Sequence, residues 1–238
     1  LIFLQTRSNN KCNGIVTHTK PHVKILTGTK TEMQLMQLPL SAMTETSKTP
    51  GSNLMERNIV YIALFSGLIA VLGLLPKLTL ISGIPITAQS LGVMLCGVIL
   101  GAKRGALAVL LFLSLVALGL PLLAGGRGGL GVFTTPWAGF LFGFPAAAYT
   151  TGYIMEKFKH MPISFAASAA AFFGSIIVLY VIAIPYYMIG AKMDLFQSLL
   201  TMSPFIPGDI IKCILAGFIA NGIHKARPDS VLSWANSR

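Results

Sequence analysis

Charged residues are scarce in this sequence of 238 residues. Asp, Glu, Lys and Arg make up 11% of it, against roughly a quarter in an ordinary soluble domain, whereas 54% of the residues are hydrophobic. This composition excludes a typical soluble enzyme.

Cysteine is also rare: there are 3, with no Cys-x-x-Cys pair and no zinc-like spacing to the 4 histidines, so neither a disulfide framework nor a metal site is indicated. We expect Cys96 and Cys213, which lie in apolar runs, to be small packing residues.

The apolar part of the sequence also lacks the residue sets on which catalysis depends. It has no Ser-His-Asp set, no paired carboxylates and no histidine cluster, and His160 and His224 fall at the ends of apolar runs. We therefore expect a protein that is not an enzyme.

Basic residues outnumber acidic ones, 18 to 7, which gives a formal net charge of +11. In a soluble protein this excess would suggest nucleic acid as a partner. Here seven of the 18 lie in the first 58 residues, and most of the others fall between apolar runs. This distribution is typical of membrane topology, so we expect no nucleic-acid partner.

Residues 1–58 differ from the rest of the chain. They are polar, rich in Thr and Lys, and contain no apolar run long enough for a signal peptide, so we expect a disordered N-terminal extension. One interpretation is an upstream extension or an over-long gene model, with the natural start near Met43 or Met55. A targeting segment is the alternative, since residues 1–31 contain no acidic residue.

From residue 59 the sequence reads as six hydrophobic segments. Each has at least 17 residues, and a membrane-spanning helix needs roughly 17 to 25. Continuous apolar runs favour helices over the alternating pattern of a membrane barrel. The predicted fold is therefore an all-α, multi-pass membrane domain over residues 59–225, followed by a short cytoplasmic tail, 226–238. The segments cover about 59–76, 86–102, 105–123, 132–155, 163–190 and 205–223.

The basic residues near the segment ends set the predicted orientation. With both termini in the cytoplasm, eight of them fall on the inner side and three on the outer side, which satisfies the positive-inside rule. The inner residues are Lys48, Arg57, Lys103, Arg104, Lys157, Lys159, Lys225 and Arg227, and the outer ones are Lys77, Arg127 and Lys192.

Small residues recur four positions apart in three segments, which lets helix backbones approach closely in a membrane. We expect the later pairs, Gly97 with Gly101 and Gly139 with Gly143, to serve packing within the bundle. Ala63 and Gly67 in the first segment are instead a candidate face for another membrane subunit.

Two features on the predicted outer side suggest a binding site. Residues 125–131 place five glycines around Arg127; this loop could fold over a ligand, although a flexible hairpin would look the same. It lacks the Lys-Ser/Thr of a phosphate-binding P-loop. Asp209 and Lys212 stand three apart in the first turn of the last segment and share one helix face. They form either a local ion pair at the helix start, where Asp209 can act as a cap, or the polar end of a pocket.

Further polar and aromatic residues fall at the same predicted level. Thr87 and Gln89 begin the second segment, Trp137 lies early in the fourth, and Tyr186 and Tyr187 lie late in the fifth. Trp137 suits the aromatic belt at a membrane interface, or helix packing, as well as it suits a platform for a ligand.

Four motifs together resemble a known family. Residues 83–94 (GIPITAQSLGVM), residues 101–106 (GAKRGA), the glycine-rich loop and the Asp209-x-x-Lys212 pair closely resemble the BioY family, the biotin-specific substrate-binding subunits of energy-coupling factor (ECF) transporters. The resemblance covers about residues 57–225, and the order of the four motifs along six helices makes it specific.

The resemblance implies a subunit of the cell membrane that captures biotin on the extracytoplasmic side. It would work with a transmembrane coupling subunit and two cytoplasmic ATPases; ATP would be used only by those partners, and this chain would need no cofactor. The family couples through an Ala-x-x-x-Ala pattern on the first helix, where this sequence has Ala63 and Gly67.

The same resemblance assigns ligand binding to Arg127, Asp209 and Lys212, with Thr87, Gln89 and Trp137 as further candidates. Asp209 suits the ureido N–H groups of biotin, and either Lys212 or Arg127 suits its carboxylate. Two alternatives stay open at this point. One is a related subunit for another vitamin. The other is an intramembrane enzyme with Asp209 as acid or base, which the lack of a second catalytic group disfavours.

Overall fold

The structure is a computed structural model and describes residues 50–75, 78–79 and 85–235. The chain divides into two units, Leu1–Lys48 and Thr49–Arg238, and only the second is described below. The expected disorder of residues 1–58 falls mostly outside the described residues. Helix α2 starts at Pro50, within the segment predicted as a polar extension, and Pro suits the first turn because its missing N–H would have no partner there.

The described part of the chain is helical apart from one short antiparallel pair of strands, β1 (Leu78–Thr79) and β2 (Pro85–Ile86), in which Leu78 pairs with Ile86. This confirms the all-α class. The membrane-domain helices are α2 (Pro50–Gly73), α3 (Gln89–Leu95) with the π-helical η2 (Cys96–Leu100), α4 (Ala102–Ala117), α5 (Ala138–Lys157), α6 (Ile163–Phe172) with the π-helical η4 (Phe173–Val178) and α7 (Leu179–Ala191), α8 (Leu195–Met202), and α9 (Ile206–Ala226). Shorter 3-10 turns are η3 (Leu130–Thr134), η5 (Ser203–Phe205) and η6 (Pro228–Ser230), and α10 (Leu232–Ala235) is the last helix.

Three helical runs are long and apolar enough to cross a membrane: Met55–Gly73, Ile163–Ala191 and Leu195–Ala226. Large apolar side chains cover their outer faces; Leu64, Val181 and Phe218 are each about 60% exposed or more. A soluble protein rarely exposes so much contiguous apolar surface. The molecule is therefore a helical membrane protein.

Close packing between α5 and its neighbours depends on glycine. A Cβ on Gly139 or Gly143 would press into Ala183, Tyr186 or Leu179 of α7, and one on Gly97 would meet the Ala148 carbonyl of α5. These three glycines pack within the bundle, as predicted.

Gly101 also lies close to Glu156 of α5, and in addition its φ of +86° ends η2 and lets α4 begin at the next residue. The first N–H of α4, on Ala102, donates to Glu156 Oε1 at 2.9 Å. Lys103 and Arg104, which the sequence prediction placed in a loop, thus lie in the first turn of α4.

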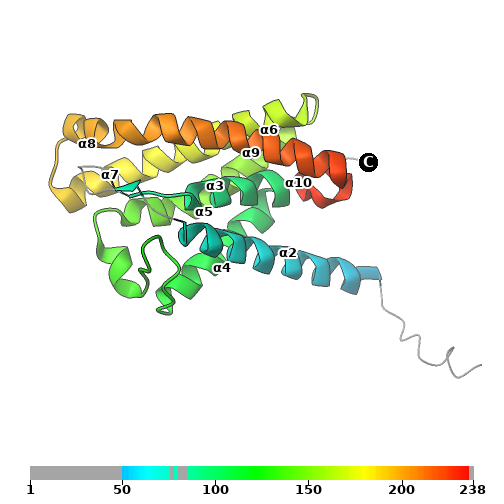
Figure 1. Cartoon of the computed structure of the whole chain (residues 1–238), viewed down its shortest axis with the longest axis horizontal. Helices are drawn as coiled ribbons and strands as arrows, with labels where there is room; N and C mark the ends of the chain where they lie inside the picture. The colour runs from blue at the N-terminus through cyan, green and yellow to red at the C-terminus, as the bar shows by residue number, and fades with distance from the viewer. Residues whose placement is uncertain (1–49, 76–77, 80–84, 236–238) are drawn as a thin grey trace, which may run out of the picture. The chain divides into compact units, whose positions relative to one another are not determined.

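The two ends of the bundle are built from different segments (Figure 1). The long connection from α4 to α5 and the short helix α8 lie at one end, and η6 and α10 lie at the other. The predicted tail is packed at this second end: Val231 is fully buried, Ser233 Oγ donates to the Val98 carbonyl, and Arg57 of α2 donates to the Asp229 carbonyl at 2.7 Å. We call these the loop end and the α10 end.

Candidate functional site: a cavity at the loop end

A cavity opens at the loop end, among α3, the α4–α5 connection, α5, α7 and α9. Its volume is about 110 Å³, enough for several water molecules, so the protein's own side chains do not fill it. All six residues predicted as ligand contacts line it: Thr87, Gln89, Arg127, Trp137, Asp209 and Lys212. Residues far apart in the sequence thus meet at one place.

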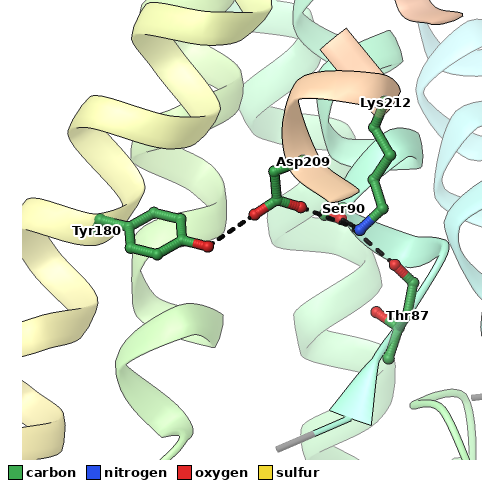
Figure 2. Close-up of polar contacts among 5 residues, drawn as sticks. All are labelled: Thr87, Ser90, Tyr180, Asp209 and Lys212. Carbon is green, nitrogen blue, oxygen red and sulfur yellow. Dashed lines mark hydrogen bonds and ion pairs between the residues drawn. The ribbon is translucent and has the colours of Figure 1, made fainter. Parts of the chain in front are cut away.

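An ion pair with two further partners forms the polar part of the wall (Figure 2). Lys212 Nζ donates to Asp209 Oδ1 at 3.0 Å and to Ser90 Oγ of α3 at 2.8 Å. Tyr180 of α7 donates its hydroxyl hydrogen to Asp209 Oδ2 at 2.8 Å. The two charged side chains are 17% and 11% exposed. Three helices are therefore joined through one buried pair.

The pair satisfies both alternatives drawn from the sequence, because it is a local ion pair and also lines the cavity. Asp209 does not cap α9. The helix begins three residues earlier with no side-chain cap, and each carboxylate oxygen accepts one hydrogen bond, from Lys212 or from Tyr180, which leaves lone pairs for further donors. An ammonium has three donors, and Lys212 uses two of them, which leaves one for a ligand.

Apolar and aromatic side chains make up most of the remaining wall. Trp137 stacks on the buried Tyr187 with ring centroids 4.7 Å apart, and Phe140 meets Tyr180 edge-on at 5.9 Å. Trp137 therefore packs within the bundle and also faces the cavity. Such a surface favours an apolar ligand body, while the few polar groups fix its orientation.

The glycine-rich loop is a compact turn and not a loose hairpin. Leu123 and Arg127 exchange backbone hydrogen bonds at 3.0 and 3.3 Å, and Gly125, Gly126 and Gly129 have φ between +69° and +85°. Glycine adopts these angles at little cost. The turn places the exposed side chain of Arg127 at the rim of the cavity, with no carboxylate within ion-pair distance among the described residues.

Gln89 is 3% exposed, and backbone groups occupy its amide. Its Nε2 donates to the carbonyls of Leu122 at 3.0 Å and Ile69 at 3.4 Å, and its Oε1 accepts from Ala124 N at 3.1 Å. Gln89 therefore ties the loop to α2 and α3. This makes it a positioning residue, although its side chain also lines the cavity.

Sequence reasoning missed Tyr180 and Ser90 as site residues. They are 29 and 122 positions away from the partners that they contact, so no local spacing connects them. Tyr180 did offer one signal, because a tyrosine hydroxyl in the middle of an apolar segment needs a buried partner.

Ala63 and Gly67 lie outside the cavity, on the exposed side of α2. A Cβ on Gly67 would meet no atom within 4 Å. Neither residue is used for packing within the described part of the chain. The structure thus leaves this face of α2 open.

The fold and the cavity define a helical membrane protein with a small-molecule cavity near one end. The sequence model of the BioY family matches residues 43–229. The chain belongs to the BioY family.

The chain aligns with its relatives over almost their full length. The chain is 47% identical to the biotin transporter BioY of Rhodobacter capsulatus, over 75% of this chain and 99% of that protein. It is 44% identical to the biotin transporter BioY of Rhizobium etli, over 72% and 95%. A crystal structure of the S-component for biotin from an ECF-type ABC transporter matches with a TM-score of 0.69 and 29% identity, over 73% of this chain and 94% of that one.

Proposed function

We propose that this chain is the biotin-binding subunit of an ECF-type transporter and serves biotin uptake across the cell membrane. Its membership of the BioY family, the relatives named as biotin transporters and the fold shared with a biotin S-component support this function. The chain is then a binding and transport subunit and not an enzyme. In this proposal ATP is bound by partner subunits, and the chain itself carries no cofactor.

The observation that carries the proposal is the largely buried Asp209–Lys212 pair in a mostly apolar cavity with Arg127 at the rim. Biotin has a ureido group that donates and accepts hydrogen bonds, an apolar bicycle and chain, and a carboxylate. In our proposal the ureido N–H groups donate to Asp209, and the free donor of Lys212 reaches the ureido oxygen. The carboxylate then meets Arg127, because that guanidinium is exposed and has no acidic partner among the described residues.

The proposed topology has six membrane spans, with both termini in the cytoplasm and the cavity on the extracytoplasmic side. The order of helical segments α2, α3–η2, α4, α5, α6–η4–α7 and α9 supports it. So does the gathering of basic residues at the α10 end, where Arg57 contacts Asp229 and Lys103, Arg104 and Lys159 lie in one cleft with α10.

The proposed partners are a transmembrane coupling subunit and two cytoplasmic ATPases. A partner helix can approach the backbone of α2 closely at Ala63 and Gly67, because both positions are exposed and small. We therefore propose this face as the contact with the coupling subunit.

Ligand identification tests the function. Protein purified in detergent from cells grown with biotin should contain one biotin per chain by mass spectrometry. Labelled biotin bound to the purified protein should be displaced by unlabelled biotin and not by thiamine, riboflavin or pantothenate. Absence of bound biotin, or displacement by another vitamin, would contradict the proposal.

A further inference from the structure

A second cavity, of about 440 Å³, lies at the α10 end of the bundle, away from the candidate biotin site. It is bounded by the start of α4, the last turns of α5, the residues just after α5, and α10. Its polar wall contains three basic side chains, those of Lys103, Arg104 and Lys159. None of these takes part in the proposed binding of biotin.

The charges in this cleft are not balanced. Glu156 is the one acidic residue among those that line it, and its Oε1 already accepts the N–H of Ala102. Among the described residues, one ion pair has its charged atoms within 4.0 Å of each other, namely Lys212–Asp209 at the loop end. The three basic side chains of the cleft therefore have no carboxylate within that distance. Lys157 lies next to the cleft, 5.5 Å from the ring centre of Tyr153. Two positive charges are thus in excess inside the cleft, and the described residues supply no anion for them.

Phosphate is the anion that such a group of side chains suits. A guanidinium can donate two parallel hydrogen bonds to phosphate oxygens, and two ammonium groups can donate to the remaining oxygens. The start of α4 adds little, because its first N–H is already bonded to Glu156. The contacts to an anion must therefore come from the three side chains.

The surface beside the cleft is apolar and exposed. Such a surface can contact acyl chains, which a soluble phosphate lacks, so it favours a lipid as the ligand. Along α4, one face runs from Lys103 to Leu107, Leu110 and Leu111, which are 37% to 51% exposed. Along α5, Tyr153 and Tyr149 are about half exposed and stand one turn apart. Both stripes extend from the cleft toward the middle of the bundle. Tyrosine is typical of the membrane interface, where its ring is apolar and its hydroxyl is hydrated.

We propose that this cleft binds the phosphate of an anionic phospholipid, whose acyl chains lie along the exposed faces of α4 and α5. The inference depends on the membrane embedding of the bundle and not on biotin as ligand. With the proposed topology, the lipid belongs to the cytoplasmic leaflet, which carries the anionic headgroups.

The test uses the full chain in mixed micelles of phosphatidylglycerol and phosphatidylcholine, with bound lipid counted by native mass spectrometry. The wild-type protein should retain phosphatidylglycerol in preference to phosphatidylcholine. Lys103→Gln, Arg104→Gln and Lys159→Gln combined should reduce this preference about tenfold or more, since each basic residue near an anionic surface contributes on the order of 1 kcal/mol. The matched control removes three exposed charges that do not line the cleft, two of them at the same end of the bundle, with Lys192→Gln, Lys225→Gln and Arg227→Gln. It should keep most of the preference, because these side chains do not reach an anion held in the cleft.

Biotin affinity reports the fold of both triple variants and should be unchanged, because the biotin cavity is at the loop end. A wild-type protein with no preference for phosphatidylglycerol would overturn the proposal, as would an equal preference in the cleft variant. Retention of glycerol phosphate by the wild-type protein without any retained phosphatidylglycerol would assign the cleft to a soluble phosphate and reject the lipid. A cleft variant that keeps its lipid but no longer co-purifies with partner subunits would assign the cleft to an acidic protein surface.

Discussion

Asp209 is the residue on which the site's polar chemistry depends most. Replacing it with Asn keeps its size, but it leaves Lys212 without a counter-ion in a desolvated place. We expect Asp209→Asn and Lys212→Ala each to weaken biotin binding by about 2 kcal/mol or more, as for other members of buried polar networks. Tyr180→Phe removes one neutral donor and should cost about 1 kcal/mol. Isothermal titration calorimetry on the purified protein measures all three.

The matched control is Asp194→Asn, which removes an exposed carboxylate at the start of α8 and should leave the affinity unchanged. Unchanged affinity in both the Asp209 and the Lys212 variants would show that biotin binds elsewhere.

We expect Gln89 to act on the ligand through the loop. Gln89→Leu removes the acceptor of the Ala124 N–H and the donor to the Leu122 carbonyl, and it should destabilise the loop by about 1 to 3 kcal/mol. We expect faster amide hydrogen exchange in residues 122–131 and faster dissociation of biotin, with a smaller change in association. Gln197→Leu, at an exposed position on α8, is the control. Weaker binding without faster exchange would mean that Gln89 contacts the ligand directly.

The sequence predicted one half of the polar network and not the other. Asp209 and Lys212 are neighbours on one helix, and helical spacing is enough to pair them. Tyr180 and Ser90 meet them only through tertiary packing, which no local pattern encodes. The hydrogen bonds of the Gln89 amide could not be predicted either, because its partners are backbone atoms whose positions depend on the folded loop.

At the level of helices, α2 offers a direct test of partner contact. Gly67→Leu should leave the fold and biotin binding intact, because the position is exposed and an added Cβ meets no atom of the described residues within 4 Å. The larger residue should prevent close approach of the coupling subunit. Cells that express the complete transporter should then lose most of their biotin uptake. Pull-down of the partner subunits measures the contact itself.

Gly222→Leu is the matched control, because Gly222 is also an exposed helical glycine with open space around it, on α9. Normal uptake by the Gly67 variant would contradict the proposed coupling face.

Hydropathy located the helical segments but not all of their boundaries. It reports how long a run can stay in lipid, so α5, the long α6–α7 run and α9 lie close to the predicted segments. It does not report backbone hydrogen bonding, so it missed the π-helical turns η2 and η4 and placed Lys103 in a loop. It also left residues 191–204 as a connection, where the structure has α8.

For the whole molecule, the proposed orientation gives opposite accessibility at the two ends. In a Cys12→Ser background, a cysteine introduced by Lys192→Cys should react with a membrane-impermeant maleimide in intact cells, and one introduced by Lys225→Cys should react only after permeabilisation. Both sites are exposed, and the native Cys96 and Cys213 are buried. A fluorescent protein fused after Arg238 should fold and fluoresce. The reverse labelling pattern would overturn the topology.

The neutrality of the Asp209–Lys212 pair has a consequence for turnover. A ligand-free protein with an unpaired buried carboxylate would be unstable. It would also bind biotin so tightly that dissociation became slow. Because the two groups already neutralise each other at 3.0 Å, the proposed site adds ligand bonds to a pair that stays balanced whether the vitamin is bound or absent. In our proposal, loading and unloading therefore leave no unpaired charge inside the protein in either state.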